Sequence, residues 1–93
     1  MNALTQRVFD VVKAHVLDVL TDIDPVEVTP ETSIVALGGN SLDRAEVAML
    51  SMETLGLKLP RTAVVGVACL GELAQVLSRH LEVGAPGLGN VTR

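Results

Sequence analysis

A run of aliphatic side chains at helical spacing, between residues 4 and 23, most limits how this chain can fold. Its members recur every three or four residues, which places them on one side of an α-helix: Leu4, Val8, Val12, Val16, Leu20 and Ile23. Asp24-Pro25 then predicts the end of the helix, because proline disfavours helical geometry in the residue before it. The apolar face of this helix needs other elements to cover it.

Two further helices are expected in the rest of the chain. One covers Ser41–Leu55, with Gly56 as a left-handed cap, and the last covers Leu70–Leu81. Residues 62–67 predict a short helix or, from the propensity of their valines, a strand. We expect an all-α fold, a small bundle of three main helices plus one short helix.

Ninety-three residues predict one domain, near the lower end of what folds alone around one core. Phe9 is the only aromatic residue, so the core must be aliphatic. From Val83 onward, glycines and a proline indicate a flexible tail. We therefore expect a domain over residues 1–82 and a tail over residues 83–93.

The charges of the chain are unevenly placed. Eight of its eleven acidic residues lie between Asp18 and Glu53, where Arg44 is the only basic residue. An acidic surface repels nucleic acid and anionic lipid and attracts basic protein surfaces.

Cys69 is the single cysteine, so neither an internal disulfide nor a metal-ligand cluster is expected. No signal peptide or membrane-spanning run is evident, and we expect a cytoplasmic monomer.

The connection between the first two helices is long for so small a domain, which is typical of a functional or a disordered segment. It ends in the run Leu37-Gly38-Gly39-Asn40-Ser41-Leu42-Asp43. Two glycines free the backbone, and the helix that follows presents the Ser41 hydroxyl on its first turn. The chain offers no plausible base to activate this hydroxyl, which favours a site that another enzyme modifies. The alternative is that Ser41 only caps the helix.

The second helix has apolar residues on two sides. At about 100° per residue, one side carries Leu42, Ala45, Met49 and Met52. The roughly opposite side carries Val47, Ala48 and Leu55. A small domain buries only one side fully, so the other is an exposed strip for docking a protein. Periodicity alone leaves open which side is buried.

The chain resembles an acyl carrier protein over nearly its whole ordered length. The resemblance rests on the first helix, on the run before Ser41, and on three further runs: residues 28–34, Gly56-Leu57-Lys58-Leu59-Pro60 and Leu70-Gly71-Glu72-Leu73. In that family a phosphopantetheinyl transferase moves 4′-phosphopantetheine from coenzyme A to the matching serine, here Ser41. The thiol of this arm holds acyl groups as thioesters. The resemblance implies an acyl-carrier-like bundle that carries cargo and is not an enzyme.

Asn40 departs from the aspartate that is common before the serine. Asn40-Ser41, Asp43-Arg44-Ala45-Glu46-Val47, Met52-Glu53 and Leu59-Pro60-Arg61 resemble a narrower group, the free-standing carriers of β-branching cassettes in bacterial polyketide synthases. That group holds acetyl, sometimes propionyl. It donates the acyl group to a 3-hydroxy-3-methylglutaryl (HMG) synthase homologue, and its cassette includes an acyltransferase and a decarboxylating ketosynthase.

We expect the partners to contact the exposed side of the second helix, at Leu42, Asp43, Arg44, Ala45, Glu46, Met49 and Glu53. The alternatives are core packing for the apolar members and a solvated face for the acids. Arg44 selects the partner or pairs with a neighbouring carboxylate. Two other functions stay open: a carrier for fatty acid synthesis or amino-acid loading, and an unmodified protein-interaction module.

Overall fold

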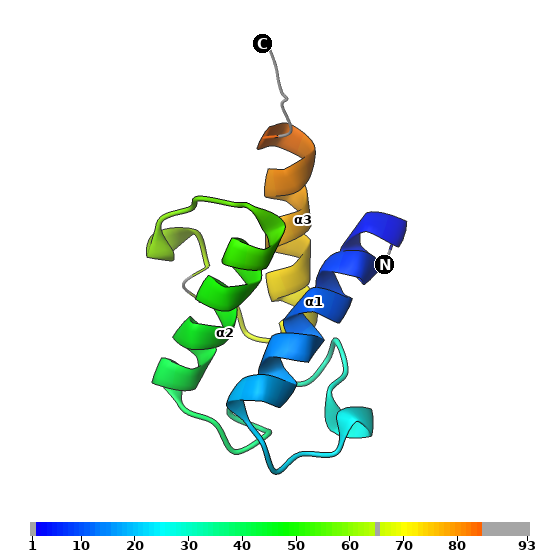
Figure 1. The fold of residues 1–93 in the computed structure, drawn as a ribbon, viewed down its shortest axis with the longest axis vertical. Helices are drawn as coiled ribbons and strands as arrows, with labels where there is room; N and C mark the ends of the chain where they lie inside the picture. The colour runs from blue at the N-terminus through cyan, green and yellow to red at the C-terminus, as the bar shows by residue number, and fades with distance from the viewer. Residues whose placement is uncertain (1, 65, 85–93) are drawn as a thin grey trace.

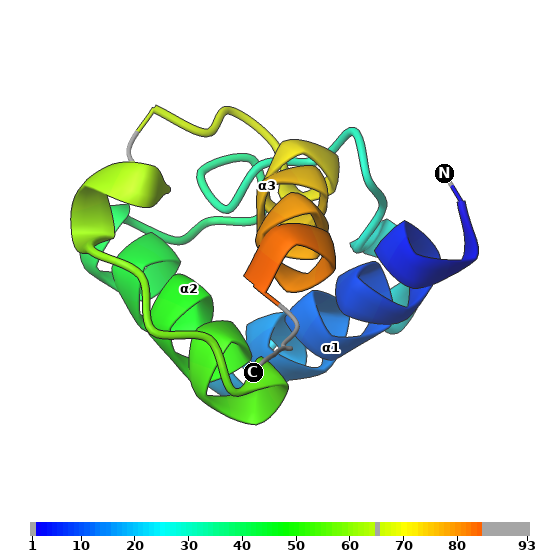
Figure 2. The same cartoon turned by 90° about the horizontal axis from the view of Figure 1, so that it is seen from above.

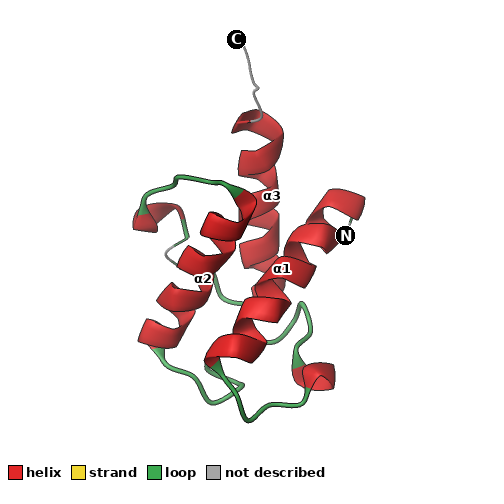
Figure 3. Ribbon diagram, viewed as in Figure 1, coloured by secondary structure: helices red, strands yellow, loops and turns green. Residues whose placement is uncertain are grey.

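Three α-helices build the fold (Figure 1). The computed structural model describes residues 2–64 and 66–84. Its elements, in chain order, are α1 (Ala3–Val19), the 3₁₀ helix η1 (Pro25–Glu27), α2 (Ser41–Leu55), the 3₁₀ helix η2 (Arg61–Ala63) and α3 (Leu70–Gly84). The described residues contain no strand, as the colours of Figure 3 make plain. The expected all-α bundle is therefore confirmed, and the strand alternative is wrong for the described part of residues 62–67.

α1 is the helix on which the other two pack. Its valines Val8, Val12 and Val16 are buried completely or nearly so. Both α2 and α3 lie along α1, whereas α2 and α3 meet each other over a much smaller area (Figures 1 and 2). The core is aliphatic apart from one ring, as predicted, and consists of Val8, Phe9, Val12, Val16, Val28, Ile34, Val47, Ala48, Met52, Leu70, Leu73, Ala74 and Leu77.

One side-chain hydrogen bond joins α1 to each of its neighbours. The Thr5 and Ser78 hydroxyls lie 3.0 Å apart, buried between α1 and α3. His15 Nε2 lies 2.7 Å from Thr54 Oγ1, between α1 and α2. A buried hydroxyl needs a partner, so the Thr5–Ser78 pair fixes how α3 sits along α1.

The first helix is shorter than its apolar periodicity predicts. It ends at Val19, and Leu20 takes an extended conformation with φ −109° and ψ 92°. Leu20 and Ile23 still pack against the core, but from the loop. The polar residues Thr21 and Asp22 favour a turn at this point. The apolar spacing therefore predicted the buried residues correctly and the end of the helix wrongly.

The long connection is held in place by the N-terminus of α3. The Leu70 N–H donates to the Thr32 carbonyl at 2.9 Å, and the Gly71 N–H donates to the Pro30 carbonyl at 2.7 Å. These are N–H groups that have no partner within a helix, so the loop caps α3 with its own backbone. Ile34 of the same loop is buried in the core. The loop is therefore an ordered part of the fold.

Between α2 and α3, helical structure is shorter than predicted. Only Arg61–Ala63 form a helical turn, closed by the Ala63 N–H bonding to the Pro60 carbonyl at 3.0 Å. Gly66 has φ +83°, a left-handed conformation that a right-handed helix cannot include. α3 continues past Leu81 to Gly84, and the expected tail falls on residues 85–93, outside the described residues, apart from its first two positions.

The Gly71→Ala substitution is expected to destabilise the fold. A Cβ at this position would lie 2.9 Å from the Pro30 carbonyl oxygen and 3.0 Å from Pro30 Cβ. Such overpacking outweighs the better helix preference of alanine, so we expect the free energy of unfolding to fall by about 1–2 kcal/mol. Urea unfolding followed by circular dichroism measures it. The control Gln75→Ala, exposed on the same helix, should change stability by less than about 0.5 kcal/mol. An unchanged midpoint for Gly71→Ala would contradict the predicted contact.

Candidate functional site

Ser41 is the first residue of α2, and the residue before it caps the helix. The Asn40 side-chain oxygen accepts a hydrogen bond from the Asp43 N–H at 2.9 Å. In return, the Asp43 carboxylate accepts one from the Asn40 N–H at 3.0 Å. This reciprocal pair is a capping box, so the alternative that Ser41 is the cap is wrong. The Asn-x-x-Asp spacing of Asn40 and Asp43 is a local signal for this cap, although the cap was not predicted from the sequence.

The Ser41 hydroxyl is therefore free for another role. The residue is exposed, and it lies where the unpaired N–H groups of a helix start favour negative charge. That preference contributes about 0.3–1 kcal/mol at an exposed site. The site thus fits a group attached through a phosphodiester.

Two glycines bring the loop to Ser41. Gly38 has φ +93°, in the left-handed region that favours glycine. A Cβ on Gly39 would lie 2.5 Å from the Ile34 side chain and 3.2 Å from a methyl group of Leu20. The Gly39 N–H also bonds to the Ile34 carbonyl at 2.9 Å. The buried Ile34 and the glycines therefore fix where α2 begins.

α2 divides into a buried and an exposed side. The buried residues are Val47, Ala48, Ser51 and Met52. Leu42 is 78% exposed and Met49 is 43% exposed, although both are large apolar residues. Met52, which the helical projection placed with them, is only 7% exposed. It lies at the edge of that group, where the helix turns toward the core, so the predicted apolar strip loses one member.

The seven residues expected to dock a partner do not all lie together. Four form an exposed surface, here named the outer face of α2: Leu42, Glu46, Met49 and Glu53. Asp43 is only partly exposed, because its carboxylate belongs to the capping box. Arg44 and Ala45 line a cavity beside the outer face.

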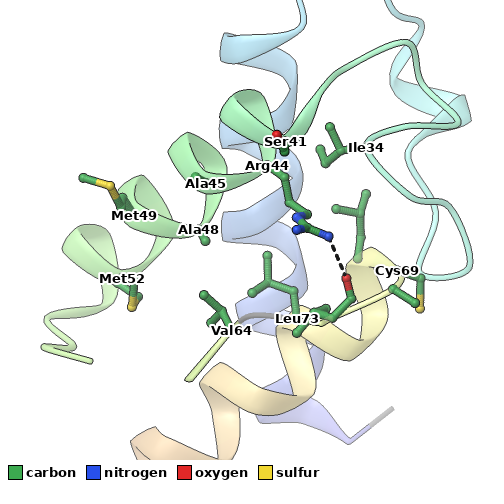
Figure 4. Close-up of a pocket in the computed structure, with 13 residues that line it drawn as sticks. Ile34, Ser41, Arg44, Ala45, Ala48, Met49, Met52, Val64, Cys69 and Leu73 are labelled. Atoms are coloured by element: carbon green, nitrogen blue, oxygen red, sulfur yellow. Dashed lines mark hydrogen bonds between the residues drawn. The ribbon is translucent and has the colours of Figure 1, made fainter. Parts of the chain in front are cut away.

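This cavity lies between α2 and the segment that leads into α3 (Figure 4). Its volume is about 110 Å³. Ser41 stands at its edge, and most of its lining is apolar. The lining residues are Ile34, Ser41, Arg44, Ala45, Ala48, Met49, Met52, Val64, Val67, Ala68, Cys69, Leu70 and Leu73. Val64 and Val67 line this cavity, and no sequence pattern indicated it. Whether they reach a cavity depends on the distance between α2 and α3, which only the folded structure shows.

Arg44 crosses the mouth of this cavity. Its guanidinium group donates to the Val67 carbonyl at 3.5 Å, drawn as the dashed line in Figure 4. The side chain is otherwise exposed. Arg44 therefore places a positive charge next to an apolar cavity and one helical turn from Ser41.

Other features of the described chain add no second site. Within residues 2–64 and 66–84, no group of His, Cys, Asp and Glu is placed to hold a metal ion. Across the same described residues, none of the helices has the length and hydropathy needed to cross a membrane. The Ser51 hydroxyl is fully buried and has no hydrogen-bond partner.

Comparison with known proteins gives two kinds of match. The family model described as a phosphopantetheine attachment site matches residues 10–77. The polyketide biosynthesis acyl-carrier-protein AcpK of Bacillus subtilis is 43% identical over 72 residues, which are 77% of this chain and 88% of that protein. The meromycolate extension acyl carrier protein of Mycolicibacterium smegmatis is 31% identical over 78 residues, 83% of this chain and 79% of that protein.

One solved structure has a similar fold. It is the crystal structure of the curacin biosynthetic pathway HMG synthase in complex with acetyl donor-ACP. The match has a TM-score of 0.76 and 29% sequence identity, and it covers 85% of this chain and 99% of that chain. The similarity therefore extends over nearly the whole of that chain.

Replacing Asn40 tests the cap beside Ser41. We expect Asn40→Ala to lower the free energy of unfolding by about 1 kcal/mol, because the Asp43 N–H loses its acceptor. Asn40→Asp should stay within about 0.5 kcal/mol of the unsubstituted protein, since aspartate caps a helix equally well. Urea unfolding of the three proteins measures both effects. If Asn40→Ala were as stable as the unsubstituted chain, the capping box would not be formed in solution.

Proposed function

Because the chain belongs to the acyl carrier proteins, we propose that it carries acetyl, or another short acyl group, for β-branching in polyketide biosynthesis. Its cofactor is 4′-phosphopantetheine, and we assign the attachment to the Ser41 hydroxyl. The observation that supports this assignment best is an exposed serine at the start of α2 whose capping role is filled by Asn40. The protein is a carrier and performs no reaction of its own.

The residues around Ser41 suit this role. Asn40 and Asp43 hold the first turn of α2 in place, and the helix N-terminus favours the negative charge of a phosphodiester. Gly38 is exposed and adds no side chain that would hinder a transferase. When attached, the arm supplies a terminal thiol that holds the acyl group as a thioester.

The cavity beside Ser41 favours a short cargo. Its volume of about 110 Å³ is smaller than the ~150 Å³ apolar cavity that holds one benzene molecule. Acetyl or propionyl fits such a space, whereas a long fatty acyl chain is larger than the cavity as it stands in this structure. The higher identity to the polyketide carrier AcpK than to the meromycolate carrier points the same way.

We propose the partners of a β-branching cassette. A phosphopantetheinyl transferase attaches the arm, and an acyltransferase and a decarboxylating ketosynthase prepare the acetyl group. An HMG synthase homologue then accepts it. The similarity to a chain from an HMG synthase complex with its acetyl donor supports this last partner.

The outer face of α2 is the proposed docking surface for the synthase. It combines exposed apolar groups, Leu42 and Met49, with the carboxylates of Glu46 and Glu53. The carboxylates speed the association with a basic partner, and the apolar groups supply the contact at the centre of the interface. A surface this small also lets the partner dissociate. The flexible side chain of methionine suits a surface that several enzymes contact.

Intact-mass measurement tests the attachment site. Incubation with coenzyme A and a broad-specificity phosphopantetheinyl transferase should raise the mass by one phosphopantetheine group. Ser41→Ala should show no increase. The control Ser33→Ala changes a serine of the preceding loop and should still be modified.

The result also separates the alternatives. A folded protein that gained no mass with any transferase would be an unmodified interaction module. A mass increase that persisted in Ser41→Ala would place the arm on another residue.

Two substitutions test the docking surface. Glu46→Lys and Met49→Ala should each weaken productive docking of the acetyl-loaded carrier on the synthase by about 1 kcal/mol, which is about fivefold in the transfer rate at low carrier concentration. Both residues are exposed, so the fold should be unaffected. The effect of Glu46→Lys should shrink as salt increases.

Asp18→Lys is the matched control for the charge reversal. Asp18 is exposed, and it lies on α1. Its variant should transfer acetyl at the unsubstituted rate. Equal slowing by Asp18→Lys and Glu46→Lys would mean that net charge, and not the outer face of α2, governs docking.

A further inference from the structure

We propose that Arg44 binds the phosphodiester of the arm carried by Ser41, and that this contact directs the arm toward the cavity. The inference rests on the proposed attachment at Ser41. In this proposal Arg44 binds the cofactor of its own chain. The sequence had suggested instead that Arg44 selects the partner or pairs with a neighbouring carboxylate.

Position on α2 brings the two residues together. Arg44 follows Ser41 by three residues, and side chains at this spacing are neighbours on a helix surface. Both line the mouth of the same cavity, and the arginine side chain extends from α2 on the side of Ser41 that faces this cavity (Figure 4). An arginine side chain is long enough to reach a group attached to the hydroxyl one turn away.

The guanidinium group has little else to bind. Among acceptors in the described residues, only the Val67 carbonyl lies within hydrogen-bonding distance, at 3.5 Å. That distance is long for a hydrogen bond, and the acceptor is uncharged. The nearest carboxylate in sequence, that of Asp43, already accepts the Asn40 N–H.

A phosphodiester is a much better acceptor for this group. Arginine offers five N–H donors in a planar fork that matches the oxygens of a phosphate, and charge-assisted bonds of this kind are about twice as strong as neutral ones. Arg44 is also the only basic residue between Asp18 and Glu53. It therefore supplies a positive side chain, one turn from Ser41, within an acidic stretch of the sequence.

The contact has a geometric consequence. Leu42, Glu46 and Glu53 of the outer face do not line the cavity, whereas Met49 belongs to both surfaces. A phosphodiester bound by Arg44 starts the arm on the cavity side. Leu42, Glu46 and Glu53 are then left uncovered for a partner while the cargo lies next to the apolar lining.

Nuclear magnetic resonance of the arm-carrying protein tests the inference. The probes are the Nε–H signal of Arg44 and the phosphorus signal of the phosphodiester. Attachment of the arm, verified by mass, should shift the Arg44 signal more than that of Arg79. In Arg44→Gln, the phosphorus signal should move away from its position in the unsubstituted protein. Arg44→Lys should restore it in part, because lysine keeps the charge but not the fork.

Arg79→Gln is the matched control, since Arg79 is an exposed arginine of α3. It removes the same charge and should leave the phosphorus signal unchanged. A second readout is thermal unfolding with and without the arm. Any gain in Tm that the arm gives the unsubstituted protein should be smaller by about 2–4 °C in Arg44→Gln and unchanged in Arg79→Gln.

The outcomes distinguish the two proposals. If the arm is attached but the Arg44 and phosphorus signals do not respond as stated, the role of Arg44 is wrong and the carrier function stands. Equal phosphorus shifts in Arg44→Gln and Arg79→Gln would also overturn it. If the unsubstituted protein gains no arm, both proposals fail.

Discussion

The structure depends on the burial of one aliphatic stripe of α1 by two helices at once. Val8, Val12 and Val16 have almost no exposed surface, and with one aromatic ring in the whole chain this burial must come from many small side chains. α2 covers this stripe from one side of α1, and α3 covers it from the other. Because they are not required to pack closely on each other, a cavity is left between them. The site at Ser41 lies at its edge as a direct result.

The position of Ser41 is fixed by contacts that are distant in sequence. The carbonyls of Pro30 and Thr32 bind the first N–H groups of α3, and Ile34 enters the core. Gly39 packs closely against Ile34, and α2 begins two residues later, at Ser41. A loop that spans one end of the bundle (Figure 3) therefore positions Ser41, the proposed attachment residue.

Local signals in the sequence predicted what is local in the structure. The bounds of α2 follow from the residues before Ser41 and from Gly56, whose φ of +71° ends the helix as expected. The end of α1 was predicted wrongly, since Leu20 and Ile23 keep the apolar spacing but pack from the loop. The direction of Arg44 and the cavity that it crosses depend on how α2 and α3 are spaced, which no run of residues encodes by itself.

The two sides of α2 also separate two kinds of inherited change. Substitutions at Leu42, Glu46 and Glu53 touch solvent and, under the proposed function, a partner, whereas those at Val47, Ala48 and Met52 touch the core. Effects at sites without shared contacts add nearly independently. A lineage of such carriers is therefore free to exchange one partner enzyme for another through surface substitutions alone, without first acquiring compensating mutations in its interior.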